Sequence, residues 1–315
     1  MKISFLDTKT LGNDLTFDEF HSLGETIIYQ ITTPEEVCDH IHDSDVVIVN
    51  KIKLNKQNLA NAHNLKLICV AATGFDNIDL EYCKTRGIGV CNVVGYSTHS
   101  VAQVTLAMAL SLATHLPEYN KFVHNGSYSG SGVANKLTPF YRELYGKVWG
   151  VVGLGNIGKQ VARVAESMGC HVVGYKRTPD SDFPCCGLDE LCSTADIISV
   201  HLPLSEETNG LISEEKIALM KKNAIFINVS RGAITDEAAL AKAVLEERIA
   251  GLGIDVYSQE PFGTNHPFSS LLSLPNVCLT PHMAWGACES RARCLHEIAN
   301  NIKSYFSGGN KNRLV

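Results

Sequence analysis

The sequence lacks the features that direct a protein to nucleic acid or to a membrane. It has no dense basic tract, and 27 Lys and Arg residues stand against 33 Asp and Glu residues, for a net charge of −6. This balance leaves no electrostatic footprint for nucleic acid or an anionic lipid surface. The amino terminus, MKISFLDTKTLGND, has no apolar run of the signal-peptide kind, and no stretch of about 18 apolar residues occurs elsewhere. We therefore expect a cytoplasmic protein with neither a nucleic-acid nor a membrane partner.

Chelating pairs of cysteines are also missing. The chain has eleven cysteines, an odd number, but no CxxC pair. Cys185 and Cys186 are adjacent, a spacing that does not suit a tetrahedral metal site. We interpret the cysteines as reduced thiols that serve as small core residues, and we expect no metal site.

Short apolar runs divide the chain into two α/β series. The composition, 45% hydrophobic and 19% charged, is that of a globular protein, and 315 residues suggest two domains with a cleft between them. Apolar runs separated by about the length of a crossover helix are typical of parallel sheets. The first series is KISFLD, TIIYQI, DVVIVN and LKLICVAAT; the second is KVWGVVGLG, CHVVGYKR, ADIISVHLP, AIFINVS, IAGLGIDV and NVCLTPH. The continuous Val, Ile and Leu runs of the second series indicate a sheet covered on both faces.

Two segments of different character join the series. HSVAQVTLAMALSLATHL is apolar on nearly every face, which is typical of a helix buried between two domains or two subunits. From Tyr119 to Tyr145 we expect irregular chain, rich in Gly, Ser and aromatic residues. Such a segment in a compact domain usually has a function or covers a partner.

A glycine-rich turn predicts a dinucleotide site. GLGNIG follows the apolar run VWGVV and precedes the helical KQVARVAESMG. Gly153 permits the tight turn, Gly155 lets the backbone approach a pyrophosphate, and Gly158 lets helix and strand pack closely, with Asn156 and Ile157 between them. The amino terminus of the helix offers amide hydrogens and a partial positive charge to the phosphates. This strand–turn–helix setting favours dinucleotide binding over a purely structural turn.

The end of the next strand bears on the choice between NAD and NADP. An acidic residue there usually binds the ribose 2′-hydroxyl of NAD, but this chain has Lys176. Lys176 and Arg177 can pair with a 2′-phosphate, and Thr178 can add a hydroxyl donor. The alternative is that both cations point to solvent and Asp180 or Asp182 turns back to the ribose. We favour NADP over NAD.

Three segments near the ends of later strands suit hydride transfer to a keto acid. They are NVSRGAITDEAAL with Arg231, IDVYSQEP with Asp255 and Glu260, and LTPHMAWG with His282. Reduction needs a cation for the substrate carboxylate and an acid for the new alkoxide. The fork of an arginine suits the first task, and a histidine paired with a carboxylate suits the second.

Other readings of the same residues stay open. Arg231 could cap a helix, and a lone histidine is usually structural. His266 and His99 are rivals of His282 on loops, but we expect neither at a strand end beside a carboxylate.

Over nearly its entire length the chain resembles the D-isomer-specific 2-hydroxyacid dehydrogenases. The resemblance rests on GLGNIG, VSRG, DVYSQEP and TPHMAW in this order and spacing. Within the family, the segments VNK, AATGFDNID and NVVGYSTHSVAQ are most similar to glycerate dehydrogenases, also called hydroxypyruvate reductases. The resemblance implies two doubly wound α/β domains: a flavodoxin-like substrate domain, residues 1–97 and 287–315, and an inserted Rossmann cofactor domain, residues 98–286. It also implies that the aromatic segment is a dimerisation arm, so we expect a homodimer.

The resemblance further implies individual roles. His282 would be the general acid/base, Glu260 its partner and Arg231 the cation that binds a small 2-keto or 2-hydroxy acid. Thr73 and Gly74 would bind the substrate carboxylate, with Lys51 nearby, although a solvated lysine is the alternative for Lys51. The remaining residues expected to contact the cofactor, besides the glycine loop and residues 176–178, are His201, Pro203, Thr208, Val229, Asp255, His282 and Ala284.

Proteins related to this family have other functions, which are the alternatives for this chain. Some act as corepressors that sense the dinucleotide and keep the same site residues, so turnover has to decide against them. A formate dehydrogenase is disfavoured because that branch has an amide where Glu260 stands. A D-lactate or phosphoglycerate dehydrogenase is the alternative enzyme, and the feedback-regulated phosphoglycerate enzymes are disfavoured because no regulatory domain follows residue 315.

Overall fold

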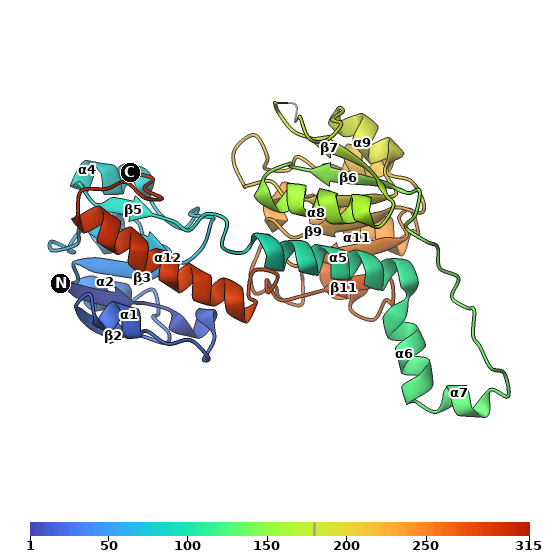
Figure 1. The fold of residues 1–315 in the computed structure, drawn as a ribbon, viewed down its shortest axis with the longest axis horizontal. Coiled ribbons are helices and arrows are strands. Elements are labelled where there is room, and N and C mark those ends of the chain that lie inside the picture. The colour runs from blue at the N-terminus through green and yellow to red at the C-terminus, as the bar shows by residue number, and fades with distance from the viewer. Residues whose placement is uncertain (179–180) are drawn as a thin grey trace. The chain divides into compact units, whose positions relative to one another are not determined.

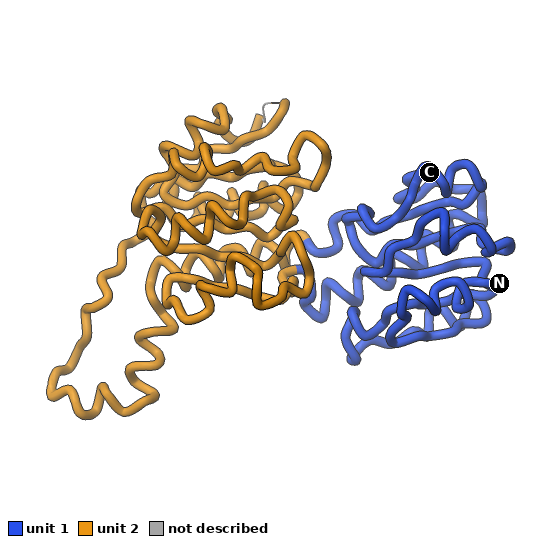
Figure 2. The backbone as a smooth tube through the Cα atoms, turned by 180° about the vertical axis from the view of Figure 1, so that it is seen from behind, with its two compact units in different colours: residues 1–97, 285–315 blue, residues 98–284 orange. Residues whose placement is uncertain are grey.

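The computed structural model describes residues 1–178 and 181–315. These residues form two compact units (Figure 2). Unit 1 comprises Met1–Ser97 and Trp285–Val315, and unit 2 comprises Thr98–Ala284. The chain therefore leaves unit 1 and returns to it, and the second passage lies two residues before the boundary expected at residue 286.

The centre of unit 1 is a five-stranded parallel sheet with the strand order β2-β1-β3-β4-β5. This is the flavodoxin-like order of a doubly wound sheet, as expected. One strand was missed from the sequence: β5 has only three residues and begins with Gly89, so it carries little apolar signal. The strands are β1 (Lys2–Phe5), β2 (Glu25–Ile28), β3 (Val46–Val49), β4 (Leu67–Val70) and β5 (Gly89–Cys91).

Helices cover both faces of this sheet and give unit 1 two cores (Figure 1). On one face, residues of α1 and α12 pack against alternate strand residues such as Phe5 and Ile48. On the other, residues of α2, α3 and α4 pack against the intervening ones, such as Val47 and Val49. This alternation is the period of two expected of strands buried on both sides. The helical elements are η1 (Thr8–Leu11), α1 (Asp18–His21), α2 (Val37–Ile41), α3 (Lys56–Leu59), α4 (Leu80–Arg86) and α12 (Cys288–Phe306).

Unit 2 has a six-stranded parallel sheet with the order β11-β10-β9-β8-β6-β7. All six strands were expected from the sequence. The chain runs from β6 outward to β7 and then returns to place β8 on the other side of β6, which makes the carboxyl ends of β6 and β8 the topological switch point where ligands of such sheets bind. The strands are β6 (Val148–Val152), β7 (His171–Tyr175), β8 (Ile197–Val200), β9 (Ile225–Asn228), β10 (Gly251–Ile254) and β11 (Val277–Leu279).

Helices also lie on both faces of the second sheet. The apolar helix α5 packs on α8, β9 and β10 through residues such as Val101, Met108 and Leu112. Leu110 of the same helix is 40% exposed in the single chain. The helical elements are α5 (Thr98–Thr114), α6 (Leu116–His124), α7 (Ser127–Gly130), α8 (Asn156–Ser167), α9 (Leu188–Thr194), α10 (Glu214–Leu219), η2 (Gly232–Ile234), α11 (Glu237–Leu245) and η3 (Pro267–Leu271).

Residues 115–146 form an arm that leads away from the sheet of unit 2 and returns to β6 (Figure 1). The expectation of irregular chain from Tyr119 to Tyr145 was partly wrong, because α6 and α7 lie in this part of the chain. Pro117 in the first turn of α6 suits a helix start, since its missing amide would have no partner there. Neither helix buries a residue in the single chain.

Two further expectations concern membrane-spanning helices and the state of the cysteines. None of the helices in residues 1–178 and 181–315 is long and apolar enough to cross a membrane. All eleven cysteines are free. Burial raises the pKa of the Cys83 thiol to about 11 and that of Cys294 to about 12, so both remain neutral thiols at physiological pH.

Candidate functional site

The glycine loop between β6 and α8 has the geometry that its sequence predicts. Gly153 has a φ of +102°, and a Cβ there would lie 2.9 Å from the carbonyl oxygen of His201. A Cβ at Gly158 would lie 2.0 Å from the carbonyl oxygen of Gly153, so any side chain would push the helix off the turn. Gly155, in contrast, has no heavy atom within 4 Å of its Cβ position. Protein packing thus accounts for two of the glycines, and the third leaves open space at the helix end.

Open space at Gly155 fits a bound pyrophosphate. Gly155 is the N-cap of α8 and supplies no side-chain cap, so capping by the N-cap residue does not occupy the first amides of this 12-residue helix. Helix amino termini bind phosphate through these amides and through the helix dipole. The residues present therefore fit the diphosphate of a dinucleotide, and Asn156 and Ile157 are the first two residues of the helix after Gly155.

The cations after β7 are exposed, and one of them has a nearby acidic partner. Arg177 pairs with Glu207 at 2.7 Å, and both side chains are more than 70% exposed. Asp182 accepts a hydrogen bond from Lys159 at 2.9 Å. The alternative that Asp182 serves the ribose therefore competes with this ion pair, while Asp180 lies outside the described residues. Lys176 and Thr178 are exposed at the same strand end.

His201 follows β8 at the switch point and is held by a chain of hydrogen bonds. The indole of Trp149 donates to the Ser199 hydroxyl at 2.9 Å, and that hydroxyl lies 2.9 Å from His201 Nε2. Since the hydroxyl oxygen already accepts from the indole, its hydrogen is available to His201 Nε2, which leaves the ring proton on Nδ1. Nδ1 is shielded from solvent and has no hydrogen-bond partner among the described residues, although the residue as a whole is half-buried. Burial lowers the pKa of His201 to about 3, so the ring is neutral at physiological pH.

The loop that follows His201 is shaped by Thr208. Its hydroxyl donates to the carbonyl of Pro203 at 2.7 Å and accepts from the amide of Ser205 at 2.8 Å. The side chain expected to line the cofactor site is therefore engaged in closing its own turn. Val229, after β9, is buried.

The candidate acid/base pair forms at the carboxyl edge of the same sheet. His282, after β11, has Nδ1 2.7 Å from Oε2 of Glu260, and the side chains are 19% and 30% exposed. The other oxygen of Glu260 accepts the amide of Tyr257 at 3.0 Å. His282 has a φ of +52°, a left-handed conformation that is uncommon for residues with a side chain and that clusters at active sites. The pair is thus fixed in direction and still open to solvent.

Asp255 holds the backbone that carries His282. One of its oxygens accepts the Thr280 hydroxyl at 2.6 Å and the Met283 amide at 2.9 Å, and the other accepts the Ala284 amide at 2.9 Å. Burial is the largest influence on this carboxyl and raises its pKa, although the three donors oppose the shift. Asp255 therefore supports both sides of His282, which is a contribution the sequence alone did not reveal.

Arg231 follows β9, the neighbour of the strand β10 that Asp255 follows. Its guanidinium donates to the carbonyl of Ser230 at 2.8 Å, and its own carbonyl accepts the side-chain amide of Asn228 at 2.9 Å. The next residue, Gly232, has no room for a side chain, because a Cβ would lie 2.1 Å from the amide nitrogen of Ser258. The segments carrying Arg231 and Glu260 are consequently packed backbone to backbone.

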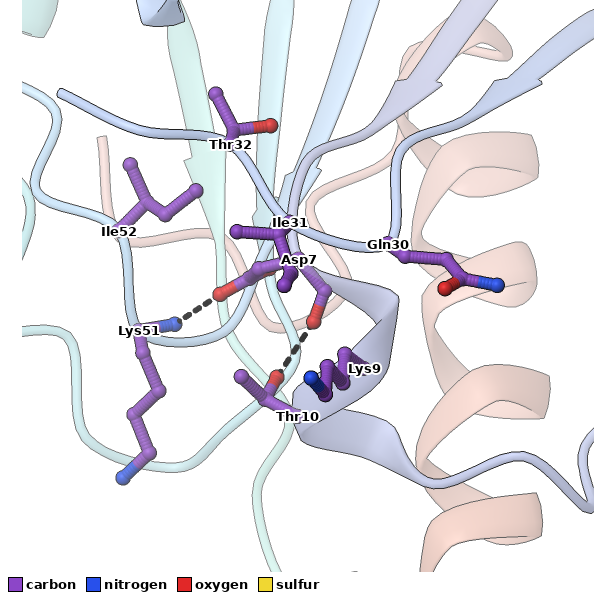
Figure 3. A pocket seen from close by; sticks show the side chains of 8 residues that line it. All are labelled: Asp7, Lys9, Thr10, Gln30, Ile31, Thr32, Lys51 and Ile52. Atoms are coloured by element: carbon purple, nitrogen blue, oxygen red, sulfur yellow. Dashed lines mark hydrogen bonds between the residues drawn. The ribbon is translucent and has the colours of Figure 1, made fainter. Parts of the chain in front are cut away.

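The residues expected to bind the substrate carboxylate belong to unit 1. Thr73 donates its hydroxyl to the Val93 carbonyl at 2.8 Å. Lys51 is exposed, and its backbone amide donates to Asp7 at 2.6 Å. Figure 3 shows Lys51 at a pocket of about 290 Å³, with its amine directed away from Asp7. The roles of these residues and of Gly74 in substrate binding stay predictions.

One expectation about the rival histidines was wrong. His266 does have a carboxylate partner, because its Nε2 lies 3.0 Å from Glu237. The two residues are 29 positions apart, and no local motif joins them, so their contact could not be predicted from the sequence. Their side chains are only 6% and 8% exposed, against 19% and 30% for His282 and Glu260. The buried pair cannot exchange protons with a substrate as readily as the half-exposed one can.

A Rossmann-type sheet with this phosphate-binding turn and a histidine–carboxylate pair at its edge defines a dinucleotide-binding α/β protein equipped for proton transfer.

Comparison with known proteins identifies the family within that class. Residues 106–284 match the family described as D-isomer specific 2-hydroxyacid dehydrogenase, NAD binding domain. The chain is 35% identical over 321 residues to the hydroxypyruvate reductase of Blautia hydrogenotrophica, with 98% of each chain covered. It is 32% identical over 313 residues to the glycerate dehydrogenase of Methylorubrum extorquens, with 99% of this chain and 98% of that one covered. A D-lactate dehydrogenase from Aquifex aeolicus, complexed with NAD and lactic acid, is 30% identical with a TM-score of 0.86, covering 98% of this chain and 96% of that one.

The chain belongs to the D-isomer specific 2-hydroxyacid dehydrogenase family. It is therefore an oxidoreductase that uses a nicotinamide dinucleotide and acts on 2-hydroxy acids. The family, the enzyme class and the two parallel α/β sheets were all predicted from the sequence and are confirmed.

Proposed function

We propose that this enzyme reduces hydroxypyruvate and glyoxylate in preference to larger 2-keto acids, and that D-glycerate oxidation is the reverse reaction. The observation that carries the proposal is the half-exposed His282–Glu260 pair at the edge of the cofactor sheet. Full-length similarity to a hydroxypyruvate reductase and a glycerate dehydrogenase supports the substrate class.

The proposed mechanism assigns separate tasks to three residues. The glycine loop from Gly153 to Gly158 would hold the reduced dinucleotide, which when bound would provide the hydride for C2 of the keto acid. Arg231 binds the substrate carboxylate and polarises the carbonyl through its guanidinium fork. Protonated His282 transfers its proton to the developing alkoxide, and the negative charge of Glu260 stabilises the imidazolium before transfer. In the reverse direction His282 accepts the hydroxyl proton.

The other residues expected at the site position the two ligands. The substrate carboxylate would also meet the backbone at Thr73 and Gly74, with Lys51 nearby. Neutral His201 fits the cofactor side of the switch point because its Nδ1 proton has no partner among the described residues. The cofactor would be bound by Gly153, Gly155, Asn156, Ile157, Gly158, Lys176, Arg177, Thr178, His201, Pro203, Thr208, Val229, Asp255, His282 and Ala284.

A panel of keto acids tests this proposal. The purified enzyme is assayed with hydroxypyruvate, glyoxylate, pyruvate and phenylpyruvate, each with NADH and NADPH. We expect the first two acids to give the highest kcat/KM, because bulky Trp285 is expected at one wall of a small substrate pocket. Better turnover of phenylpyruvate than of hydroxypyruvate would contradict the substrate class, and negligible turnover of every acid would favour a dinucleotide-sensing protein instead.

For the cofactor, NADPH is proposed over NADH. Lys176 and Arg177 lie exposed after β7, and the nearby Asp182 accepts a hydrogen bond from Lys159. Replacing both cations with glutamine is expected to weaken NADPH far more than NADH, since each lost charged contact to the 2′-phosphate costs about 1.5–3 kcal/mol. Fluorescence titration of the two cofactors measures the difference. Lys222→Gln, another exposed lysine of unit 2, is the matched control, and equal losses for both cofactors in the double variant would refute the NADP assignment.

The arm is proposed to join two copies of the chain. Its apolar side chains are exposed in the single chain, among them Phe140 at 82%, Leu137 at 66% and Leu116 at 63%. Apolar surface on this scale indicates an interface, and a stable dimer would bury more than about 2,000 Å². Light scattering at micromolar concentration should give twice the 34.3 kDa chain mass. Phe140→Ser should weaken the dimer, whereas a monomeric wild-type protein would overturn this proposal.

A further inference from the structure

A buried polar cluster in unit 2 contacts the loop that carries Glu260. Its centre is Glu237, the first residue of α11, whose carboxylate is 8% exposed. Oε1 accepts the amide of Ser258 at 2.8 Å, and Oε2 accepts the Ser258 hydroxyl. Oε2 also lies 3.0 Å from Nε2 of His266. We call Glu237, Ser258 and His266 the Glu237 cluster.

The hydrogen-bond partners of His266 determine which of its ring nitrogens carries the hydrogen. Its Nδ1 accepts the backbone amide of Phe268 at 3.2 Å, so the ring carries its proton on Nε2 and donates it to Glu237. The ring is enclosed by Tyr257, Phe262 and Phe268, with centroids 4.8–6.0 Å away. Glu237 thus receives three hydrogen bonds in a water-poor site, where such a network is strong if complete and costly if broken.

The cluster acts on the peptide that joins Tyr257 to Ser258. Glu237 accepts the Ser258 amide of this peptide, and Glu260 accepts the amide of Tyr257, which belongs to the preceding peptide, at 3.0 Å. Gly232 packs against the same peptide so closely that a Cβ would come within 2.1 Å of its carbonyl carbon. Arg231 precedes Gly232, so the Arg231 segment packs on the peptide next to the one that donates to Glu260.

We propose that Glu237 is a positioning residue, which through Ser258 and His266 sets the place of Glu260 relative to Arg231 and so orients His282 for proton transfer. This inference rests on the proposed roles of Arg231, Glu260 and His282. Glu237 does not touch the substrate in this account. It acts only through the loop that holds Glu260.

Glu237→Gln tests the proposal with almost no change in size. Glutamine offers one acceptor oxygen and an amide group in place of two acceptors, so at least one of the three donors loses its partner. We expect kcat for hydroxypyruvate to fall about 10–100-fold, because small displacements of catalytic groups cost rate on this scale. The KM for the keto acid and the dissociation constant of NADPH should change less than threefold. The alkaline limb of the pH profile of kcat should move to lower pH, because a displaced Glu260 carboxylate stabilises the imidazolium of His282 less.

Controls separate positioning from stability. Glu214→Gln changes the same residue type at the first position of α10, where the side chain is 57% exposed, and should leave kcat unchanged. Ser258→Ala keeps the backbone donor and removes only the hydroxyl, so it provides a milder variant if Glu237→Gln fails to fold. The effects of the two changes on kcat should be less than additive in the double variant, since both break the same hydrogen bond.

The outcomes distinguish this inference from the proposed function. If wild-type enzyme does not reduce any keto acid, the proposed function fails. If the wild type is active and folded Glu237→Gln and Ser258→Ala both match it in kcat and pH profile, the positioning role of Glu237 is refuted, and the cluster contributes to stability alone.

Discussion

Alanine in place of His282 should lower kcat for hydroxypyruvate reduction by about 10²–10⁴-fold, the range for loss of a general acid. The alkoxide formed by hydride transfer would then have to take its proton from water, and the loss falls on the chemical step. Binding of the dinucleotide should change much less than kcat, because most of the expected cofactor contacts, the glycine loop after β6 among them, lie elsewhere. Single-turnover oxidation of NADPH, followed by absorbance, measures the chemical step directly.

Another histidine–glutamate pair supplies the control for this result. His296 lies 2.9 Å from Glu19 on the surface of unit 1, with side chains 58% and 48% exposed. His296→Ala should retain wild-type kcat. Added imidazole should restore part of the activity of His282→Ala, and full activity of His282→Ala without it would show that another group is the acid.

Arg231→Ala should damage both binding and catalysis. Loss of the guanidinium removes two charged hydrogen bonds to the carboxylate, each contributing about 1.5–3 kcal/mol, so kcat/KM should fall by roughly 10²–10⁴-fold. The KM for hydroxypyruvate should rise and kcat should fall. The rise in KM distinguishes this variant from His282→Ala. Steady-state kinetics over a wide substrate range measures both parameters.

Arg231→Lys separates charge from geometry. Lysine retains the positive charge but lacks the planar fork, so it should recover only a small part of the lost kcat/KM. A lysine variant with wild-type kinetics would show that a point charge suffices at this position. An alanine variant with unchanged KM would show that the carboxylate is bound elsewhere.

The parallel architecture could be predicted from the sequence because buried parallel strands are continuous apolar runs. Ten of the eleven strands in residues 1–178 and 181–315 carry such runs, while β5, three residues beginning with Gly89, does not. The arm was harder, since the Gly and Ser residues of 126–132 obscure α7, and α6, which begins at Leu116, precedes them directly. Its helices bury nothing in the single chain, so no core periodicity marks them.

Site residues were predictable where a local motif carries them. Gly153 and Gly158 have the tight contacts that their motif requires, and His282 meets Glu260 as expected. The Glu237–His266 contact could not be foreseen, because it joins residues 29 apart on a helix end and a loop. The hydrogen bond between Lys159 and Asp182 could not be predicted either, because sequence spacing does not determine which surface charges meet.

The central claim is that the enzyme delivers a hydride to C2 of a small keto acid to form the D-isomer. Reduction of hydroxypyruvate with nicotinamide cofactor carrying deuterium at the transferred position of C4, followed by mass spectrometry and chiral chromatography of the product, tests it most directly. The account predicts D-glycerate with one deuterium at C2. L-Glycerate, glycerate without deuterium at C2, or no turnover would contradict it.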